Sequence, residues 1–207
     1  MIKFVYFDVG GVAILDFSKT NKWKDVTKEL GLNEKESKQF IEYWERLAPK
    51  IHIGLNINNV FNEEKKKYDL KISTDYSLLK DGFVSRFELN KSIWPVVDYA
   101  KKNFKVGLLT NQYPDMLDEI KKENLMPPVV WDVEIDSSIV KLQKPDEAIY
   151  KLAEKLANVK GSEIFFIDNS QEHIDGAKDF GWQTFLYDPS NPRKSNQALA
   201  KCLKIII

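Results

Sequence analysis

Polar and charged residues follow several short apolar runs of this sequence. The set comprises two acids, a hydroxyl, an amide and an ammonium: Asp8, Asp168, Thr110, Asn111 and Lys144. In open α/β sheets, ligands bind beyond the carboxyl ends of the strands, and these residues would lie there if the runs are strands. Taken alone, each residue is about as well explained by a structural role, as a helix cap or turn residue, as by a functional one. Their ordered combination is harder to explain in that way and favours one polar site.

Two glycines follow the first acid in the stretch FVYFDVGGVAILDF, residues 4–17. A strand that ends here would carry the carboxylate of Asp8 to the edge of the sheet. Gly10 and Gly11 would then let the backbone approach a ligand closely while the chain turns outward.

Five runs rich in β-branched and aromatic residues are candidates for the strands that position this site. They are residues 2–7, 105–109, 129–135, 163–167 and 183–187. Their apolar character is nearly continuous, which is typical of parallel strands that are covered on both faces.

Helical patterns separate the later runs. Apolar residues recur at helical spacing over 93–100 and again over 149–156. Pro145 can occupy the first turn of the second helix, and Gly181 follows a third periodic stretch where a C-terminal cap is expected. The alternation of strands and helices predicts an α/β domain with a doubly wound parallel sheet.

Residues 18–89 interrupt this alternation and hold no convincing core strand. Their helical candidates are residues 20–31, 34–48, 60–70 and, more weakly, 75–88. We therefore predict a helical insertion at 18–89, between the two parts of an α/β core at 1–17 and 90–207.

The composition bears on partners and location. Lys plus Arg and Asp plus Glu both number 31, so no net field favours nucleic acid or an anionic membrane, and we expect neither as a partner. The single cysteine, Cys202, forms no disulfide within the chain and sits among apolar residues, so we expect it to be buried. The N-terminal apolar stretch is interrupted by Lys3 and Asp8, and the final KIII is too short to span a bilayer. These features predict a cytoplasmic protein.

The polar segments, in their order and spacing, resemble the motifs of the haloacid dehalogenase-like hydrolase superfamily, in particular its members with a helical cap after the first motif. FDVGGV is similar to the nucleophile motif, LLTN to the second, KPDEAIY to the lysine motif and FIDNSQEHIDGAKDFG to the acidic metal motif. The resemblance is strong over 1–17 and 90–188, and across the insertion it consists of length and helical character. It implies a Rossmann-like core with 18–89 as a cap domain.

The resemblance implies a Mg²⁺-dependent phosphatase that acts on a small phosphorylated metabolite, with sugar phosphates among the candidates. Asp8 would attack phosphorus and form an aspartyl phosphate, which splits the hydrolysis into two easier steps. Asp8, the backbone carbonyl of Gly10 and Asp168 would hold Mg²⁺, a hard cation that suits oxygen ligands.

The same resemblance assigns roles to five further residues. Thr110 and Asn111 would bind phosphate oxygens, and Lys144 would neutralise the negative charge of the transition state. Asn169 stands where the metal motif often has a second aspartate, and Glu172 follows one helical turn later. Either could orient a metal-bound water.

Gly10 departs from the pattern of the superfamily. Most of its phosphatases carry a second aspartate there, which protonates the leaving oxygen and then activates water. Loss of such a proton carrier typically costs about 10²–10⁴ in rate. We therefore expect a working phosphatase whose rate depends strongly on the leaving group. A substitute acid from the cap, such as His52 or a tyrosine, is conceivable, and the sequence does not locate it.

Two alternatives stay open. Gly10 and Asn169 favour a catalytically weak or inactive member that serves as a binding or regulatory protein. The other alternative is a haloacid dehalogenase, which uses the same aspartate on carbon without a metal. Asp168 argues against it, because dehalogenases lack the full metal motif.

The predicted cap would decide which phosphate ester fits, because it covers the mouth of the site. Its candidate lining residues are Trp23, Phe40, Tyr43, Trp44 and His52. Aromatic residues at helical spacing more often pack within a domain, so the core of the cap is the alternative place for them.

Overall fold

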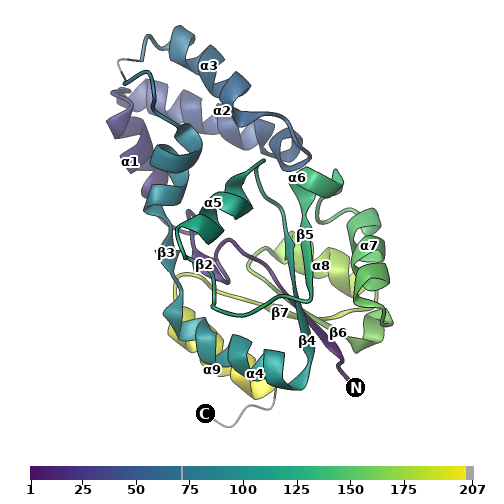
Figure 1. The fold of residues 1–207 in the computed structure, drawn as a ribbon. Coiled ribbons are helices and arrows are strands. Elements are labelled where there is room, and N and C mark those ends of the chain that lie inside the picture. The colour runs from purple at the N-terminus through teal and green to yellow at the C-terminus, as the bar shows by residue number, and fades with distance from the viewer. Residues whose placement is uncertain (71, 204–207) are drawn as a thin grey trace.

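The computed structural model describes residues 1–70 and 72–203. Within these residues a five-stranded parallel sheet has the order β5-β4-β1-β6-β7 (Figure 1). Its strands are β1 (Phe4–Phe7), β4 (Lys105–Thr110), β5 (Val133–Asp136), β6 (Ile164–Asp168) and β7 (Gln183–Leu186). Each strand overlaps one of the five predicted runs, and the prediction of a doubly wound, Rossmann-like α/β sheet is confirmed.

The two faces of the sheet pack against different helices. In β1, Val5 and Phe7 belong to one apolar core while Phe4 and Tyr6 belong to the other, because successive side chains of a strand point to opposite faces. Helices α4 (Trp94–Asn103), α5 (Met116–Lys122) and α9 (Pro192–Cys202) contribute to the first core at the sheet, and α7 (Glu147–Ala157) and α8 (Gln171–Asp179) contribute to the second. Burial on both faces explains why the strand sequences are almost entirely apolar.

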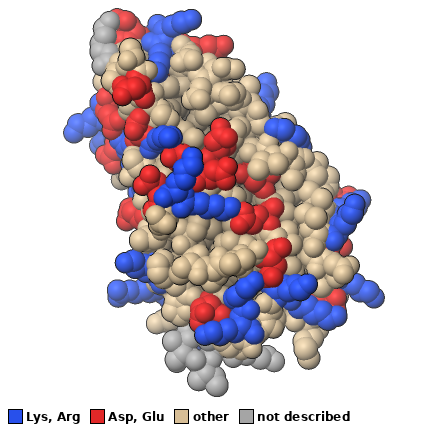
Figure 2. All heavy atoms as spheres, in the orientation of Figure 1, with Lys and Arg blue, Asp and Glu red and all other residues tan. Residues whose placement is uncertain are grey.

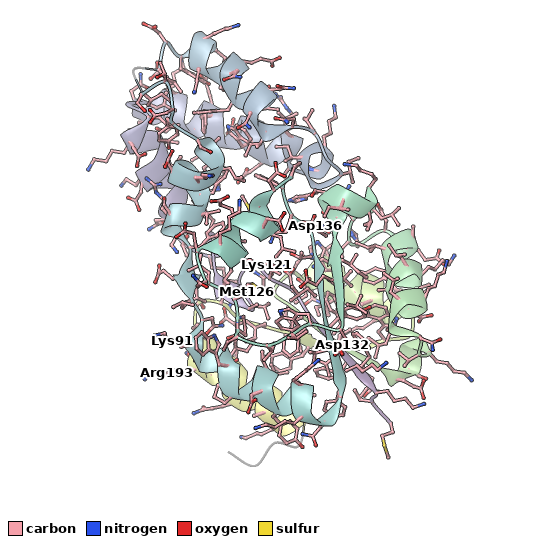
Figure 3. The ribbon with its side chains drawn as sticks, viewed as in Figure 1. Lys91, Lys121, Met126, Asp132, Asp136 and Arg193 are labelled. Atoms are coloured by element: carbon pink, nitrogen blue, oxygen red, sulfur yellow. The ribbon has the colours of Figure 1, made fainter. Side chains whose placement is uncertain are left out.

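The two ends of β5 mark the two edges of the sheet in Figure 3. Asp132 lies just before the strand, at the amino edge, and its carboxylate accepts a hydrogen bond from the backbone N–H of Val106 at 2.8 Å. Regular pairing with β4 begins after it, so β5 starts at Val133, later than the run 129–135 predicted. Asp136 ends the strand at the carboxyl edge, where the single-turn helix α6 (Ser137–Val140) follows.

Of two predicted helix ends, the structure differs at the start of α7 and agrees at the end of α8. Helix α7 begins at Glu147 with Asp146 as its N-cap, so Pro145 precedes the helix instead of lying in its first turn. Gly181 follows α8 as predicted, and its φ of 88° is a left-handed conformation that glycine adopts without strain.

The segment 18–89 is helical. It contains α1 (Lys22–Glu29), α2 (Glu34–His52) and α3 (Ile57–Lys67), followed by a π-helical turn (Leu78–Phe83) and a 3₁₀ turn (Val84–Arg86) that account for the weaker candidate near 75–88. Figure 1 shows these helices beyond the carboxyl edge of the sheet. Trp44 of α2 belongs to the same apolar core as Val5 of β1, so packing is continuous from the helices to the sheet.

A short ribbon joins the two ends of the insertion. Strand β2 (Ile14–Leu15) pairs antiparallel with β3 (Glu88–Leu89), so the chain leaves the sheet region and returns to it at one place. The sequence did not predict this ribbon, because two-residue strands are too short to show a period.

The surface carries charges of both signs, interspersed over the face that Figure 2 shows. Among the described residues, none of the helices combines the length and the apolar character that crossing a bilayer requires. Cys202 is exposed, so the prediction that it is buried is wrong. Helix α9 and the residue after it bury Leu199 and Leu203 against the core and leave Cys202 facing outward.

Candidate active site

The register of the central strands brings two acids together. β1 lies between β4 and β6, and Phe7 pairs with Leu108 on one side and with Ile167 on the other. Asp8 follows Phe7 and Asp168 follows Ile167, so the two acids emerge side by side at the carboxyl edge.

Lys144 lies between these two acids. Its Nζ is 3.0 Å from Asp8 Oδ1 and 2.6 Å from Asp168 Oδ2, and it also donates to the carbonyl of Leu109 at 2.8 Å. Lys144 is 2% exposed, Asp168 is completely buried and Asp8 is 7% exposed. Three of the segments singled out in the sequence thus meet in one buried ionic cluster.

The cluster shifts the pKa values of its members. Burial raises the pKa of Asp8 to about 6, with Asp168 adding to the rise and Lys144 opposing it. Burial alone would also raise the pKa of Asp168, but the charge of Lys144 and the contact with His173 outweigh it and hold that pKa below its usual range. For Lys144 burial acts downward, yet the two carboxylates raise its pKa above the ordinary lysine value. The ammonium therefore stays charged.

Asn111 fixes the backbone that carries the lysine. Its side chain donates to the carbonyl of Lys144 and accepts from the N–H of Lys144, both at 2.9 Å. Thr110, the residue before it, is 1% exposed, and its hydroxyl accepts a hydrogen bond from the Gln112 side chain at 3.2 Å. Asn111 reaches the cavity described below, whereas Thr110 is not among its lining residues.

The start of helix α8 holds Asp168. The backbone N–H of Ser170 donates to Asp168 Oδ1 at 2.7 Å, and His173 Nδ1 lies 3.2 and 3.1 Å from the two carboxylate oxygens. His173 was not predicted from the sequence, although its place at the start of the helix that follows Asp168 was a usable signal. Glu172, predicted near this position, is exposed, and it is His173 that turns toward Asp168.

Each glycine after the nucleophile candidate makes room for a side chain. A Cβ at Gly10 would lie 2.4 Å from Asp16 Oδ2, and one at Gly11 would lie 2.2 Å from Asn169 Nδ2. Gly11 also has a φ of 73°, which favours glycine. The chain folds back after the turn, so Asp16 returns to the site, and burial raises the pKa of its carboxyl group above the usual range.

A cavity of about 250 Å³ opens above the cluster. Its floor includes Asp8, Asn111 and Asn169, and its walls are largely apolar and aromatic, formed by Ile14, Phe17, Trp23, Phe83, Phe87, Tyr113 and Met116. Among the described residues no Lys or Arg lines the cavity, while Asp8 and Asp16 both do. Such a space suits a compact ligand with an apolar or ring face.

The aromatic residues of the insertion divide between the two places considered for them. Trp23 and His52 line the cavity, whereas Phe40 and Trp44 are completely buried in the core. Tyr43 is half-buried and lies under the guanidinium of Arg46, 5.4 Å from its ring centroid. Helical spacing alone does not separate these cases, because both surfaces of a covering helix can be apolar.

The carboxylates of Asp8 and Asp168 are oxygen ligands of the kind that a hard divalent cation prefers. Asp8 and Asp168 both contact Lys144 Nζ, so the two carboxylates lie at one place and could both be ligands of a cation beside the lysine. Among the described residues no group of three or more His, Cys, Asp and Glu side chains is arranged to hold a metal. Mg²⁺ fits such a site, because it usually binds one or two carboxylates and keeps several waters.

Comparisons with known proteins agree with this geometry. A family model described as haloacid dehalogenase-like hydrolase matches residues 2–181. No curated protein sequence matches the chain. A predicted HAD-like family hydrolase from Porphyromonas gingivalis has a similar structure, with a TM-score of 0.78, 20% identity and full coverage of both chains.

Two further solved structures show the same fold. A haloacid dehalogenase family enzyme from Bacteroides thetaiotaomicron, solved with magnesium and inorganic phosphate, has a TM-score of 0.73 and 19% identity over 90% of this chain and 94% of that one. The L-2-haloacid dehalogenase from Xanthobacter autotrophicus has a TM-score of 0.63 and 18% identity over 90% and 78% of the two chains. The family model spans most of the sequence, from the first strand through helix α8, and the chain therefore belongs to the haloacid dehalogenase-like hydrolase family.

Proposed function

We propose that this hydrolase is a Mg²⁺-dependent phosphatase that acts on a small phosphate monoester through an aspartyl phosphate on Asp8. The observation that carries the proposal is the buried contact of Lys144 with both Asp8 and Asp168 at the floor of the cavity. An attacking carboxylate and a phosphate repel each other, so a charged lysine and a divalent cation beside them supply the compensating positive charge.

Each residue of the cluster has a part in this reaction. Asp8 attacks the phosphorus, and Lys144 stabilises the charge that the transferred phosphoryl group spreads over its oxygens. Asp8, Asp168 and the backbone carbonyl of Gly10 would hold Mg²⁺, which when bound neutralises charge on the phosphate and fixes its orientation. His173 and Ser170 keep the carboxylate of Asp168 in place.

The residues around the phosphate have less direct roles. Asn111 lines the cavity, and its side-chain amide donates one hydrogen to the carbonyl of Lys144. The second hydrogen of that amide can donate to a phosphate oxygen. Because the Thr110 hydroxyl accepts from Gln112, its own hydrogen is free to donate, and we assign it to the phosphate by resemblance. Asn169 lies against Gly11 at the edge of the floor, where its amide could orient a water.

The helices over the sheet act in this proposal as a cap that selects the ester. Aromatic walls and the lack of lining Lys or Arg among the described residues favour a leaving group that is neutral and has a ring or apolar face. A second phosphate or carboxylate would meet the carboxylate of Asp16, with no Lys or Arg among the described residues lining the cavity to pair with it. Sugar monophosphates and aryl phosphates satisfy these conditions better than nucleotides or bisphosphates.

Two alternatives keep specific support. Gly10 favours a weakly active or inactive protein with a binding or regulatory role, since no proton carrier stands at that position. The likeness to an L-2-haloacid dehalogenase supports attack on carbon instead. The Bacteroides enzyme solved with magnesium and phosphate supports the phosphatase, as does the pairing of Lys144 with two acids.

The deciding experiment is a panel of phosphate monoesters assayed with Mg²⁺ and with chelator, beside 2-chloropropionate. We expect phosphate release that needs Mg²⁺ and disappears in Asp8→Asn, with Asp25→Asn, an exposed acid of α1, as the matched control. Chloride release that survives the chelator would establish the dehalogenase instead. Phosphate release that survives Asp8→Asn would remove Asp8 as the nucleophile, and a folded protein without turnover would favour the binding role.

A further inference from the structure

Asp16 is a half-buried acid that lines the cavity and has none of the roles assigned above. It lines the cavity with Asp8 and Gly10. The N–H of Ser18 donates to its Oδ1 at 2.9 Å, which fixes the side chain. Lys22, whose charge acts on Asp16, forms its ion pair with the carboxylate of Glu88 at 2.8 Å, so no ion pair ties up Asp16 among the described residues.

The carboxylate of Asp16 occupies the space next to Gly10. Any Cβ there would come within 2.4 Å of Asp16 Oδ2, closer than two such atoms approach without displacement. Asp16 reaches this space because the chain folds back, with the N–H of Ile14 donating to the carbonyl of Val9 at 3.0 Å and Ile14 bridged to Gly10. In this conformation the carboxyl group of Asp16 fills the space that a side chain at position 10 would enter, and it would have to move to admit one.

This place lies on the side where a leaving group departs. In phosphoryl transfer the attacking and leaving oxygens are roughly in line. Because Asp8 attacks from the floor, the leaving oxygen points away from it, into the cavity that Asp16 lines. An alkoxide is a poor leaving group in water, so a proton carrier on that side lowers the barrier.

The other proton carriers of the cavity are less suited to this task. His173 is held against Asp168 at 3.1 Å. Burial lowers the pKa of His52 to about 4, so its imidazole is neutral at neutral pH and not an acid of useful strength. Burial raises the pKa of Tyr113 well above its usual range, which makes the phenol a weaker acid. The carboxyl group of Asp16 lies next to Gly10, two residues after the proposed nucleophile Asp8.

We propose that Asp16 is the general acid and base of this site, an inference that rests on the proposed phosphatase function. As Asp8 bonds to phosphorus and the bond from phosphorus to the leaving oxygen breaks, Asp16 gives its proton to that oxygen and the alcohol departs. A water then attacks the phosphorus of the aspartyl phosphate while Asp16 takes a proton from it. Asp8 leaves as a carboxylate, inorganic phosphate is formed, and Asp16 is again protonated.

Leaving groups of different stability test this role. Asp16→Asn keeps the shape and the contact with Ser18 but has no proton to exchange. Its kcat/KM for an alkyl phosphate should fall by about 10²–10⁴-fold, while that for p-nitrophenyl phosphate, whose leaving group needs no proton, should fall by less than about tenfold. The control Asp25→Asn should match the wild type with both esters. An equal loss with both esters in Asp16→Asn would indicate a structural role and overturn the proposal.

Moving the carboxyl group gives an independent test. Gly10→Asp combined with Asp16→Ala should hydrolyse the alkyl phosphate at least about tenfold faster than Asp16→Ala alone, because position 10 then fills the vacated space. No recovery in a double variant with the circular dichroism and melting temperature of the wild type would contradict the inference. If the wild type releases phosphate from neither ester, the phosphatase proposal itself fails, which is a different result from equal losses in Asp16→Asn.

Discussion

Lys144 and Asp168 meet 2.6 Å apart with both side chains fully enclosed, and Asp8 lies 3.0 Å from the same ammonium. One buried cation is thus shared by two carboxylates. Without it the two acids would repel each other in a region from which water is largely excluded. The charge balance of the site is therefore coupled to the stability of the fold.

Replacing the shared cation should destabilise the metal-free protein. Lys144→Met leaves the two carboxylates facing each other, and the free energy of unfolding in chelator should fall by about 3–5 kcal/mol in a urea titration. Lys151→Met removes an exposed ammonium 2.7 Å from Glu147 and should change that free energy by less than about 0.5 kcal/mol. Equal stability of both variants would show that the buried cluster is not held by its charges.

Magnesium should stabilise the protein without any substrate. At a concentration 100 times its Kd it should add about 2.7 kcal/mol to the free energy of unfolding, since it binds only the folded chain. Asp168→Asn should lose this gain, while Asp175→Asn, on the exposed side of the same helix, should keep it. Thermal unfolding with Mg²⁺ and with EDTA measures both. A gain retained by Asp168→Asn would place the cation elsewhere.

His52 should make the protein less stable in mild acid. Its pKa falls from 6.5 to about 4 on folding, mainly by burial, so the unfolded chain binds the proton more readily. Its contribution to stability is complete above pH 6.5 and is lost as the pH falls toward 4. Over that range the wild type should lose up to about 3 kcal/mol more than His52→Gln, measured by urea titration at each pH. Parallel curves would mean that His52 titrates normally.

Trp23 should contribute to ester binding rather than to chemistry. Trp23→Ala removes part of the cavity wall, so KM for an aryl phosphate should rise by about tenfold with little change in kcat. Trp94→Ala, whose ring packs against the core and is not in the cavity lining, should leave KM unchanged. A fall in kcat without a rise in KM would assign Trp23 to the catalytic step instead.

The fold was largely predictable because its strands and helices carry strong local signals. Parallel strands buried on both faces leave continuous apolar runs, and helices over the sheet leave a stripe such as that of Val96, Val97 and Ala100. The start of β5 was misplaced because it depends on Asp132, whose partner is 26 residues away. The ribbon of β2 and β3 was missed because its two strands are 73 residues apart and only two residues long.

The candidate site divides in the same way. Asp8 and Asp168 follow from their places at the ends of neighbouring parallel strands. Lys144 lies beyond helix α6, and its contacts with Asn111 hold it at the site. His173 and Asp16 do not follow from strand ends, since each reaches the site through the turn of a helix or the return of a loop. Phe40 and Trp44 were candidates for the cavity lining but are completely buried in the core. The sequence alone could not show which aromatic residues of the insertion face the cavity.

The sequence by itself determined the sheet, its covering helices and the identity of the charged residues at the strand ends, because hydrophobic periodicity and strand order act over short stretches of chain. Only the tertiary structure decided that one lysine is shared by two acids and that the space beside Gly10 is filled by Asp16. Those contacts join residues that are far apart or separated by a turn, and their distances depend on how the whole chain packs rather than on any local pattern.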